Sequence, residues 1–472
     1  MRACWRGSNR RRAGVTQARL RLVPRRPLTL TLSPDGGEGT ALREGGVKMI
    51  RTAPGFSTRC EFRQLALRQG TKRGIVWTFF LRLRIFCAMK SGEPVSRIHI
   101  DPPRQQGRQV RLEGELRTAT GVVHRIYFEF TAPDDQPYEL RARPFLLALL
   151  LPAMNAGAPL EMELPLDDIT VSNLMEWQEA MASWHAHALK VVAIRAPRAA
   201  SPDTARPSAA LTAFSGGVDS NFTIWRQTQN VAEPLYRKTS QLKAGLMIHG
   251  FDIPLDKPED FERAWNGSRE LLEAAGLTAY RLKTNLRESG RLPGLSWGPV
   301  SHGALLAACL ACYEPWFNHI LIPSTYAYAK MRVPWASNAI TDPLYSSATT
   351  TYWHDGAGYT KFTKIKAIAA NPLVQRHLRV CWLDDPTDRN CGKCFKCVAT
   401  QVSFQLCGVE RPEAFPAPYT PAQLSGMEIA TEPNDWLMRT LRCEARRQGR
   451  HDMARRLTRA LWWWKIRRRF KK

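Results

Sequence analysis

The sequence predicts an α/β protein whose main part is a doubly wound parallel sheet, preceded by an N-terminal α+β accessory domain. From residue 209 onward, short apolar segments alternate with longer amphipathic ones. This alternation is typical of parallel strands joined by helices that cover both faces of a sheet. We expect strands at 210–214, 245–249, 279–283 and 319–323, and helices at 220–229, 258–275, 300–313 and 363–370.

Residues 89–196 show a different pattern of apolar and polar residues, and this pattern predicts the accessory domain. Apolar and polar residues alternate over 110–115 and 122–131, as they do in half-buried antiparallel strands. Residues 197–208, rich in Ala, Pro and Ser, are the expected linker to the main domain at 209–438. Further elements of the accessory domain are expected as strands at 159–166 and 189–194 and as helices at 144–154 and 173–187.

The net charge of +26 lies almost entirely at the two ends of the chain. Residues 1–88 hold 19 Lys/Arg and 4 Asp/Glu, a surplus of 15, and residues 439–472 hold 14 and 2, a surplus of 12. The other 35 basic and 36 acidic residues leave 89–438 at −1. Charge therefore informs us about partners of the ends and not about the fold.

The first 88 residues predict a disordered basic arm. The run 28–34 resembles peptides that arise when bacterial intergenic repeats are translated, so we expect Met89 to be the natural start. No apolar stretch is long and uncharged enough to span a bilayer, and no secretory signal is evident. We therefore expect a cytoplasmic protein.

A glycine-rich hexapeptide is the strongest chemical signal, since it follows an expected strand and precedes an expected helix. Its two glycines allow a tight turn. The amides after them then point into one concavity at the helix N-terminus, where anions bind. Asp219 is a candidate Mg²⁺ ligand. The G-x-x-x-x-G-K-[ST] motif of Walker-type nucleotide-binding proteins does not occur at this loop. The candidate phosphate-binding residues are Ser215, Gly216, Gly217, Val218, Asp219 and Ser220.

A cysteine triplet predicts a metal site. Cys391, Cys394 and Cys397 are spaced as in zinc knuckles, and Cys381 is the expected fourth ligand, with Cys407 as the second choice. Four protein ligands leave no open position, so the zinc would be structural. The alternatives are an iron–sulfur cluster, a redox pair or buried free cysteines.

Together the two signatures resemble the PP-loop ATP pyrophosphatases, and among them 7-cyano-7-deazaguanine synthase of the queuosine pathway. The resemblance covers 209–407 and implies an adenine nucleotide alpha hydrolase-like, Rossmann-like fold with ATP, Mg²⁺ and Zn²⁺ as cofactors. It also implies that Lys364 contacts phosphate or substrate, with Thr363 a candidate cap of that helix. The segment 341–347 departs from the synthase's substrate region, so we expect a synthase-like offshoot with its own substrate.

Polar residues that follow the other expected strands could bind the substrate, because ligands gather outside the carboxyl ends of a doubly wound sheet. Arg287 is the catalytic candidate among them, as a clamp for a carboxylate or for charge on phosphate. Each could equally be an ordinary hydrogen-bonded residue. The other candidates are Asp252, Asn285, His302 and Asp342.

We therefore expect an ATP-dependent ligase that adenylates a carboxylate, amide or carbonyl oxygen of a small molecule or modified base. The alternatives are a tRNA thiolase-like sulfur transferase and a zinc-stabilised nucleotide sensor without turnover. Residues 439–472 are expected to form a basic helical tail with three tryptophans, which could bind RNA or an anionic membrane surface or could simply cover the protein. A weakly held homo-oligomer is also expected.

Overall fold

The computed structural model describes residues 66–71, 74–79, 93–199, 208–228, 241–289, 295–381 and 389–470. The chain forms two compact units, Met1–Glu93 and Pro94–Lys472. In the first unit, β1 (Ala66–Thr71) and β2 (Gly74–Phe79) pair as an antiparallel hairpin. The expected disordered arm lies outside the described residues except for this hairpin, which the sequence analysis missed.

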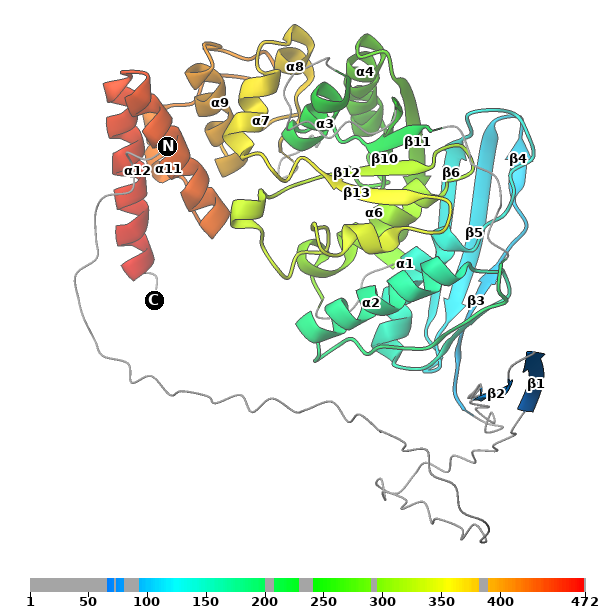
Figure 1. Ribbon diagram of the computed structural model, residues 1–472. Coiled ribbons are helices and arrows are strands. Elements are labelled where there is room, and N and C mark those ends of the chain that lie inside the picture. Colours follow the sequence, from blue (N-terminus) through cyan, green and yellow to red (C-terminus); the bar gives the residue numbers. More distant parts are fainter. Residues whose placement is uncertain are drawn as a thin grey trace, which may run out of the picture. The chain divides into compact units, whose positions relative to one another are not determined.

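The second unit is organised around one large mixed sheet (Figure 1). Its strand order is β13-β12-β9-β10-β11-β6-β5-β3-β7-β8, and β4 pairs with β5 on the same side as β3. The first half from β13 to β11 is parallel, and β11, β6, β5 and β3 pair antiparallel. The strands are β3 (Ser96–Ile100), β4 (Arg104–Gln106), β5 (Gln109–Arg117), β6 (Val123–Thr131), β7 (Leu160–Met162), β8 (Ile194–Arg195), β9 (Ala210–Ala213), β10 (Leu242–His249), β11 (Thr278–Thr284), β12 (His319–Pro323) and β13 (Thr351–Asp355).

The parallel half is doubly wound, as expected. The chain runs outward from β9 to β10 and β11, then returns to the other side of β9 to form β12 and β13. The direction of winding therefore changes between β9 and β12. In open α/β sheets, ligands usually bind outside the carboxyl ends of the two strands at which the winding changes.

The expected accessory segment is joined to this parallel half by direct strand pairing. Strand β11 pairs antiparallel with β6, and Leu282 lies opposite Phe130. One core continues across the junction, because Leu112 and Phe128 of the antiparallel strands belong to the same buried cluster as Leu282. The residues expected as an accessory domain thus share both a sheet and a core with the part that follows.

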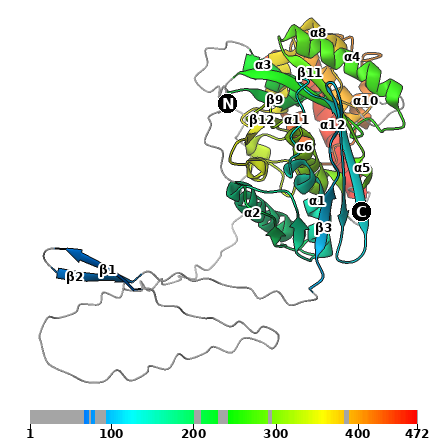
Figure 2. The same cartoon turned by 90° about the vertical axis from the view of Figure 1, so that its right-hand side faces the viewer.

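Helices cover the two faces of the sheet (Figures 1 and 2). Helices α3, α4 and α7 lie on one face, and α1 and α6 pack together on the other. The helices are α1 (Arg143–Ala156), α2 (Asp168–Trp184), α3 (Val218–Thr228), α4 (Pro258–Ala274), α5 (Leu286–Ser289), α6 (His302–Ala311), α7 (Lys361–Ile368), α8 (Pro372–His377), α9 (Phe395–Leu406), α10 (Pro421–Gly426), α11 (Glu432–Arg447) and α12 (His451–Phe470). Among these described helices, none is both long and apolar enough to cross a membrane.

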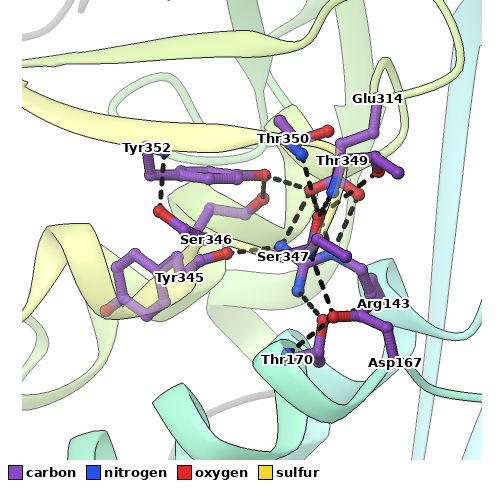
Figure 3. A network of polar contacts seen from close by, with 12 residues as sticks. Arg143, Asp167, Thr170, Glu314, Tyr345, Ser346, Ser347, Thr349, Thr350 and Tyr352 are labelled. Atoms are coloured by element: carbon purple, nitrogen blue, oxygen red, sulfur yellow. Dashed lines mark hydrogen bonds and ion pairs between the residues drawn. The ribbon is translucent and has the colours of Figure 1, made fainter. Parts of the chain in front are cut away.

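A buried ion pair ties α1 to the parallel half (Figure 3). Nε of Arg143 lies 2.8 Å from a carboxylate oxygen of Glu314, which follows α6. The same guanidinium donates to the Thr170 hydroxyl at 2.8 Å and to the Tyr345 carbonyl. The Tyr352 hydroxyl donates to Glu314 at 2.8 Å. These contacts satisfy charges that would otherwise be buried without a partner.

The C-terminal residues are helical, as expected, and form a hairpin of two helices. Helix α11 begins at Glu432, ahead of the expected boundary at residue 439, and packs against α12. The apolar face of the hairpin is buried: Leu441, Ala445 and Leu457 share a core with residues of α9.

Candidate functional site

The hexapeptide 215–220 joins β9 to α3 at the edge where the winding changes direction. Gly216 has a φ of +73°, a backbone conformation that side chains disfavour. The Asn221 side chain donates to the carbonyls of Gly216 at 3.0 Å and of Gly217 at 2.9 Å. The buried Ser220 hydroxyl also donates to the Gly217 carbonyl, at 3.2 Å. These bonds hold the turn, and the free amides of the first turn of α3 then lie at its positive end.

Asp219 makes ion pairs with two lysines from α7. Its carboxylate oxygens lie 2.5 Å from the Lys361 ammonium and 3.0 Å from the Lys364 ammonium. Burial tends to raise the pKa of Asp219, but the charges and hydrogen bonds of these lysines outweigh it, so its pKa lies below the ordinary value. Asp219 is therefore ionised at neutral pH.

The Lys364 ammonium connects the segments that follow β9 and β12, the two strands at which the winding changes. Besides Asp219, its ammonium donates to the hydroxyl of Ser324 at 2.8 Å and to the carbonyl of Ser324 at 2.5 Å. Ser324 directly follows β12, whereas Asp219 lies in the first turn of α3, which follows β9. The Lys364 side chain is only 2% exposed, and this burial lowers its pKa despite the neighbouring carboxylate.

The cap of α7 differs from the expectation. The side chain of Thr360, not that of Thr363, accepts the backbone N–H of Thr363 at 3.1 Å. The expectation that Thr363 caps the helix was wrong because the helix begins at Lys361, two residues before the expected start. Starting earlier also places Lys361 one turn before Lys364, on the same side of the helix.

The sequence analysis missed two further cations, although their spacing was visible. Lys361 precedes Lys364 by three residues, which is one helical turn. Lys396 lies between Cys394 and Cys397 at the start of α9. Its side chain reaches the surface, yet desolvation by the surrounding protein lowers its pKa to about 8, and its charge interacts with Lys361, Asp252 and Asp219.

The four expected cysteine ligands converge in space. The sulfur atoms of Cys381, Cys391, Cys394 and Cys397 all lie within 4.8 Å of one another and could hold a metal ion. Cys381 and Cys394 are 3.7 Å apart, and Cys391 and Cys397 are 3.8 Å apart. Cys381 is therefore the fourth member of the group. The second choice, Cys407, packs into a hydrophobic core instead.

The neighbouring cysteines lower the pKa of one thiol in the cluster. Hydrogen bonding to Cys397 lowers the pKa of Cys394 to about 5, and the same interaction raises the pKa of Cys397 above its ordinary value. A thiolate is the form that binds metals.

Of the other candidate substrate-binding residues, Arg287 and Asn285 make contacts that connect loops and strands. Arg287 donates to the Phe251 carbonyl and lies over the Trp297 ring, 5.0 Å from its centroid. The Asn285 side chain links the end of β11 to β6, since it accepts the Tyr127 N–H at 3.0 Å and donates to the Arg125 carbonyl. These two residues hold loops in place.

His302 and Asp342 also have partners within the protein. His302 lies 3.3 Å from the Trp297 carbonyl, and the buried Asp342 lies 2.7 Å from His354 and 2.8 Å from the Ser337 hydroxyl. By contrast, the half-buried Asp252 lies beside the loop, 3.5 Å from Arg379. The residues that the fold gathers around Asp219 and the rest of the hexapeptide are thus Asp252, Lys361, Lys364 and Arg379.

Comparison of the chain with protein-family models, with curated proteins and with solved structures finds no match. The site must therefore be interpreted from its own geometry.

Proposed function

We propose that the chain is an ATP-dependent adenylating enzyme that cleaves ATP to AMP and pyrophosphate while it activates an oxygen of its substrate. The observation that supports this most is the Lys364–Asp219 ion pair, which places a buried cation against the ionised acid of the hexapeptide. The loop, the positive end of α3 and the cations suit a pyrophosphate group.

The charges suggest a division of roles. Asp219 is a hard oxygen ligand and would hold Mg²⁺ between phosphate oxygens. Lys361, Lys364 and Lys396 would then turn toward the β- and γ-phosphates and stabilise the charge that develops as pyrophosphate leaves. Arg287 could act only if its guanidinium left the Phe251 carbonyl to which it now donates.

We propose zinc as the metal of the cysteine cluster. A tetrahedral site with Zn–S bonds of about 2.3 Å places its sulfurs roughly 3.8 Å apart. The distances of 3.7 and 3.8 Å between sulfur pairs agree with that spacing. All four positions are taken by protein, so this ion would stabilise the fold and not act on substrate.

For the reaction class we propose the formation of a carbon–nitrogen bond, similar to that of 7-cyano-7-deazaguanine synthase, on a carboxylate, amide or carbonyl of a small molecule or modified base. A thiolase-like sulfur transfer would need an exposed, acidic thiol outside the metal cluster. Cys309 and Cys312 are fully buried, and desolvation holds the pKa of each well above its ordinary value. They are poor nucleophiles.

The test is pyrophosphate release from ATP and Mg²⁺ by the full chain, screened over organic acids and deazapurines with ammonium present. We expect one class of compound to stimulate release, and Asp219→Asn to abolish it. Glu259→Gln changes an acid of α4 whose side chain is 90% exposed and serves as the matched control. ATP binding without release for any compound would favour the nucleotide-sensor alternative.

We further propose that α12 binds single-stranded RNA. Trp462 and Trp463 are 56% and 45% exposed and lie edge to face, and Arg459 is exposed one turn earlier. Indoles stack on bases, and arginines neutralise phosphates. An amphipathic helix in a membrane surface needs a free apolar face, and that face of α12 is already buried against the other helices.

This surface is tested with the double variant Trp462→Ala/Trp463→Ala, since removing residues 439–472 would open the core around Leu441 and Leu457. We expect the wild type to bind a labelled single-stranded RNA and the variant to bind it at least tenfold more weakly. Ile169→Ala, which is 49% exposed on α2, is the control. Binding to anionic vesicles but not to RNA would contradict the proposal.

A further inference from the structure

The short segment ahead of Cys381 contacts the hexapeptide loop directly. The backbone N–H of Arg379 donates to the Gly216 carbonyl at 3.0 Å. Its guanidinium donates to the Ser215 carbonyl at 3.4 Å and lies 3.5 Å from the Asp252 carboxylate. The Arg379 side chain is 8% exposed. One residue thus holds both of the first two carbonyls of the loop, only two positions before a cysteine of the cluster.

Asn390 fastens this segment to the other side of the cluster. It directly precedes Cys391 and is 4% exposed. Its side-chain oxygen accepts the N–H of Val380 at 2.8 Å and that of Cys381 at 3.3 Å. Its side-chain nitrogen donates to the Leu378 carbonyl at 2.7 Å. The Asn390 side chain therefore makes backbone hydrogen bonds, of the kind that a neighbouring strand would make, on both sides of Arg379.

The other half of the cluster carries a second cation at the start of α9. Lys396 lies between Cys394 and Cys397. The direct contact between the cluster segment and the loop is made by Arg379.

Holding the loop carbonyls fixes the direction of the loop amides. A peptide unit is planar, so a carbonyl held toward Arg379 points the N–H of the same peptide unit away from it. Successive amides that point into one concavity form an anion site. Arg379 adds to the bonds from Asn221 and so lowers the cost of ordering the loop when an anion binds.

We infer that the metal held by the four cysteines positions the hexapeptide loop through Arg379 and Asn390, so that anion binding and metal binding reinforce each other. This inference rests on the proposed function, since it takes the loop as a pyrophosphate site. Arg379 and Asn390 act here as positioning residues. Coupling between two sites is reciprocal and usually changes affinity about 5- to 150-fold.

The first experiment measures calorimetric binding of inorganic pyrophosphate with Mg²⁺ to the full, zinc-loaded chain, with no turnover involved. We expect binding that becomes at least fivefold weaker in Arg379→Met and in Asn390→Ala. Arg376→Met is the matched control, because its guanidinium lies in the same segment but is 52% exposed and pairs with Glu413. Wild-type chain that binds no pyrophosphate would contradict the proposed function itself, whereas equal binding by all variants would contradict only the coupling.

The second experiment separates positioning from general loss of structure. The rate at which a chelator removes zinc is measured with and without pyrophosphate, in the wild type and in Arg379→Met. We expect pyrophosphate to slow zinc loss at least fivefold in the wild type and to have little effect in the variant, although circular dichroism shows both folded. An equal effect of pyrophosphate in the two proteins would overturn the inference.

Discussion

The Lys364 ammonium lies 3.0 Å from the Asp219 carboxylate and joins the loop after β9 to Ser324 after β12. The two partners differ in their surroundings. Lys364 is almost fully buried, whereas Asp219 has a second partner in the part-exposed Lys361. Removing one member of this pair therefore has a different consequence from removing the other.

Asp219→Asn should destabilise the fold more than Lys364→Met. The first change leaves a buried ammonium without its carboxylate, which we expect to cost about 1–3 kcal/mol. The second removes the buried charge, and Asp219 keeps Lys361, so the free energy of unfolding should change by less than about 1 kcal/mol. Urea denaturation of both variants measures this. A larger loss in Lys364→Met would contradict the assignment of the buried charge.

The metal site should need Cys381 and not Cys407. We expect about one zinc per purified chain by plasma mass spectrometry, less than a tenth of that in Cys381→Ser, and unchanged content in Cys407→Ser. Loss of the ion should also lower the melting temperature, because metal-binding free energy contributes to folding. Zinc retained in Cys381→Ser but lost from Cys407→Ser would point to a rearranged ligand set.

Replacing only one member of the Arg143–Glu314 pair should lower the free energy of unfolding more than replacing both. Arg143→Met removes the guanidinium that neutralises the buried Glu314 carboxylate, which accepts a hydrogen bond from the Tyr352 hydroxyl (Figure 3), and we expect a loss of about 3–5 kcal/mol. Adding Glu314→Gln should recover at least half of it. Denaturation midpoints of the single and double variants give the coupling, and simple additivity would contradict it.

Asp167 should give the protein a pH-dependent contribution to stability. Burial tends to raise its pKa, but hydrogen bonds from Thr170 and Ala348 outweigh this and hold the pKa below the ordinary value. The unfolded state therefore takes up a proton first, and the contribution is fully present above about pH 5 and lost as pH falls through the folded-state pKa. The stability difference between wild type and Asp167→Asn should accordingly shrink between about pH 5 and pH 3. A difference that stays constant would contradict it.

The sequence predicted the individual strands, helices and cysteine ligands well, but not the contacts between segments that are distant in the chain. The strands β9 to β12 and the helices α3 and α4 lie within a few residues of the expected ranges, because apolar periodicity reports local burial. The four cysteines were identified because metal geometry restricts their spacing. The pairing of β6 with β11 could not be predicted, since strand alternation does not specify the partner. Arg379 and Asn390 were missed because their role depends on contacts with residues far away in the chain.

The most direct test of the adenylation proposal is the identity of the products formed from ATP by the full chain with its substrate and Mg²⁺. Chromatography of the nucleotides, with pyrophosphate assayed in parallel, should give AMP and pyrophosphate in equal amounts. Lys364→Met, although folded, should reduce both at least a hundredfold, because it removes a cation that would stabilise the leaving pyrophosphate. ADP and phosphate as products, or AMP formed equally well by Lys364→Met, would contradict the proposal.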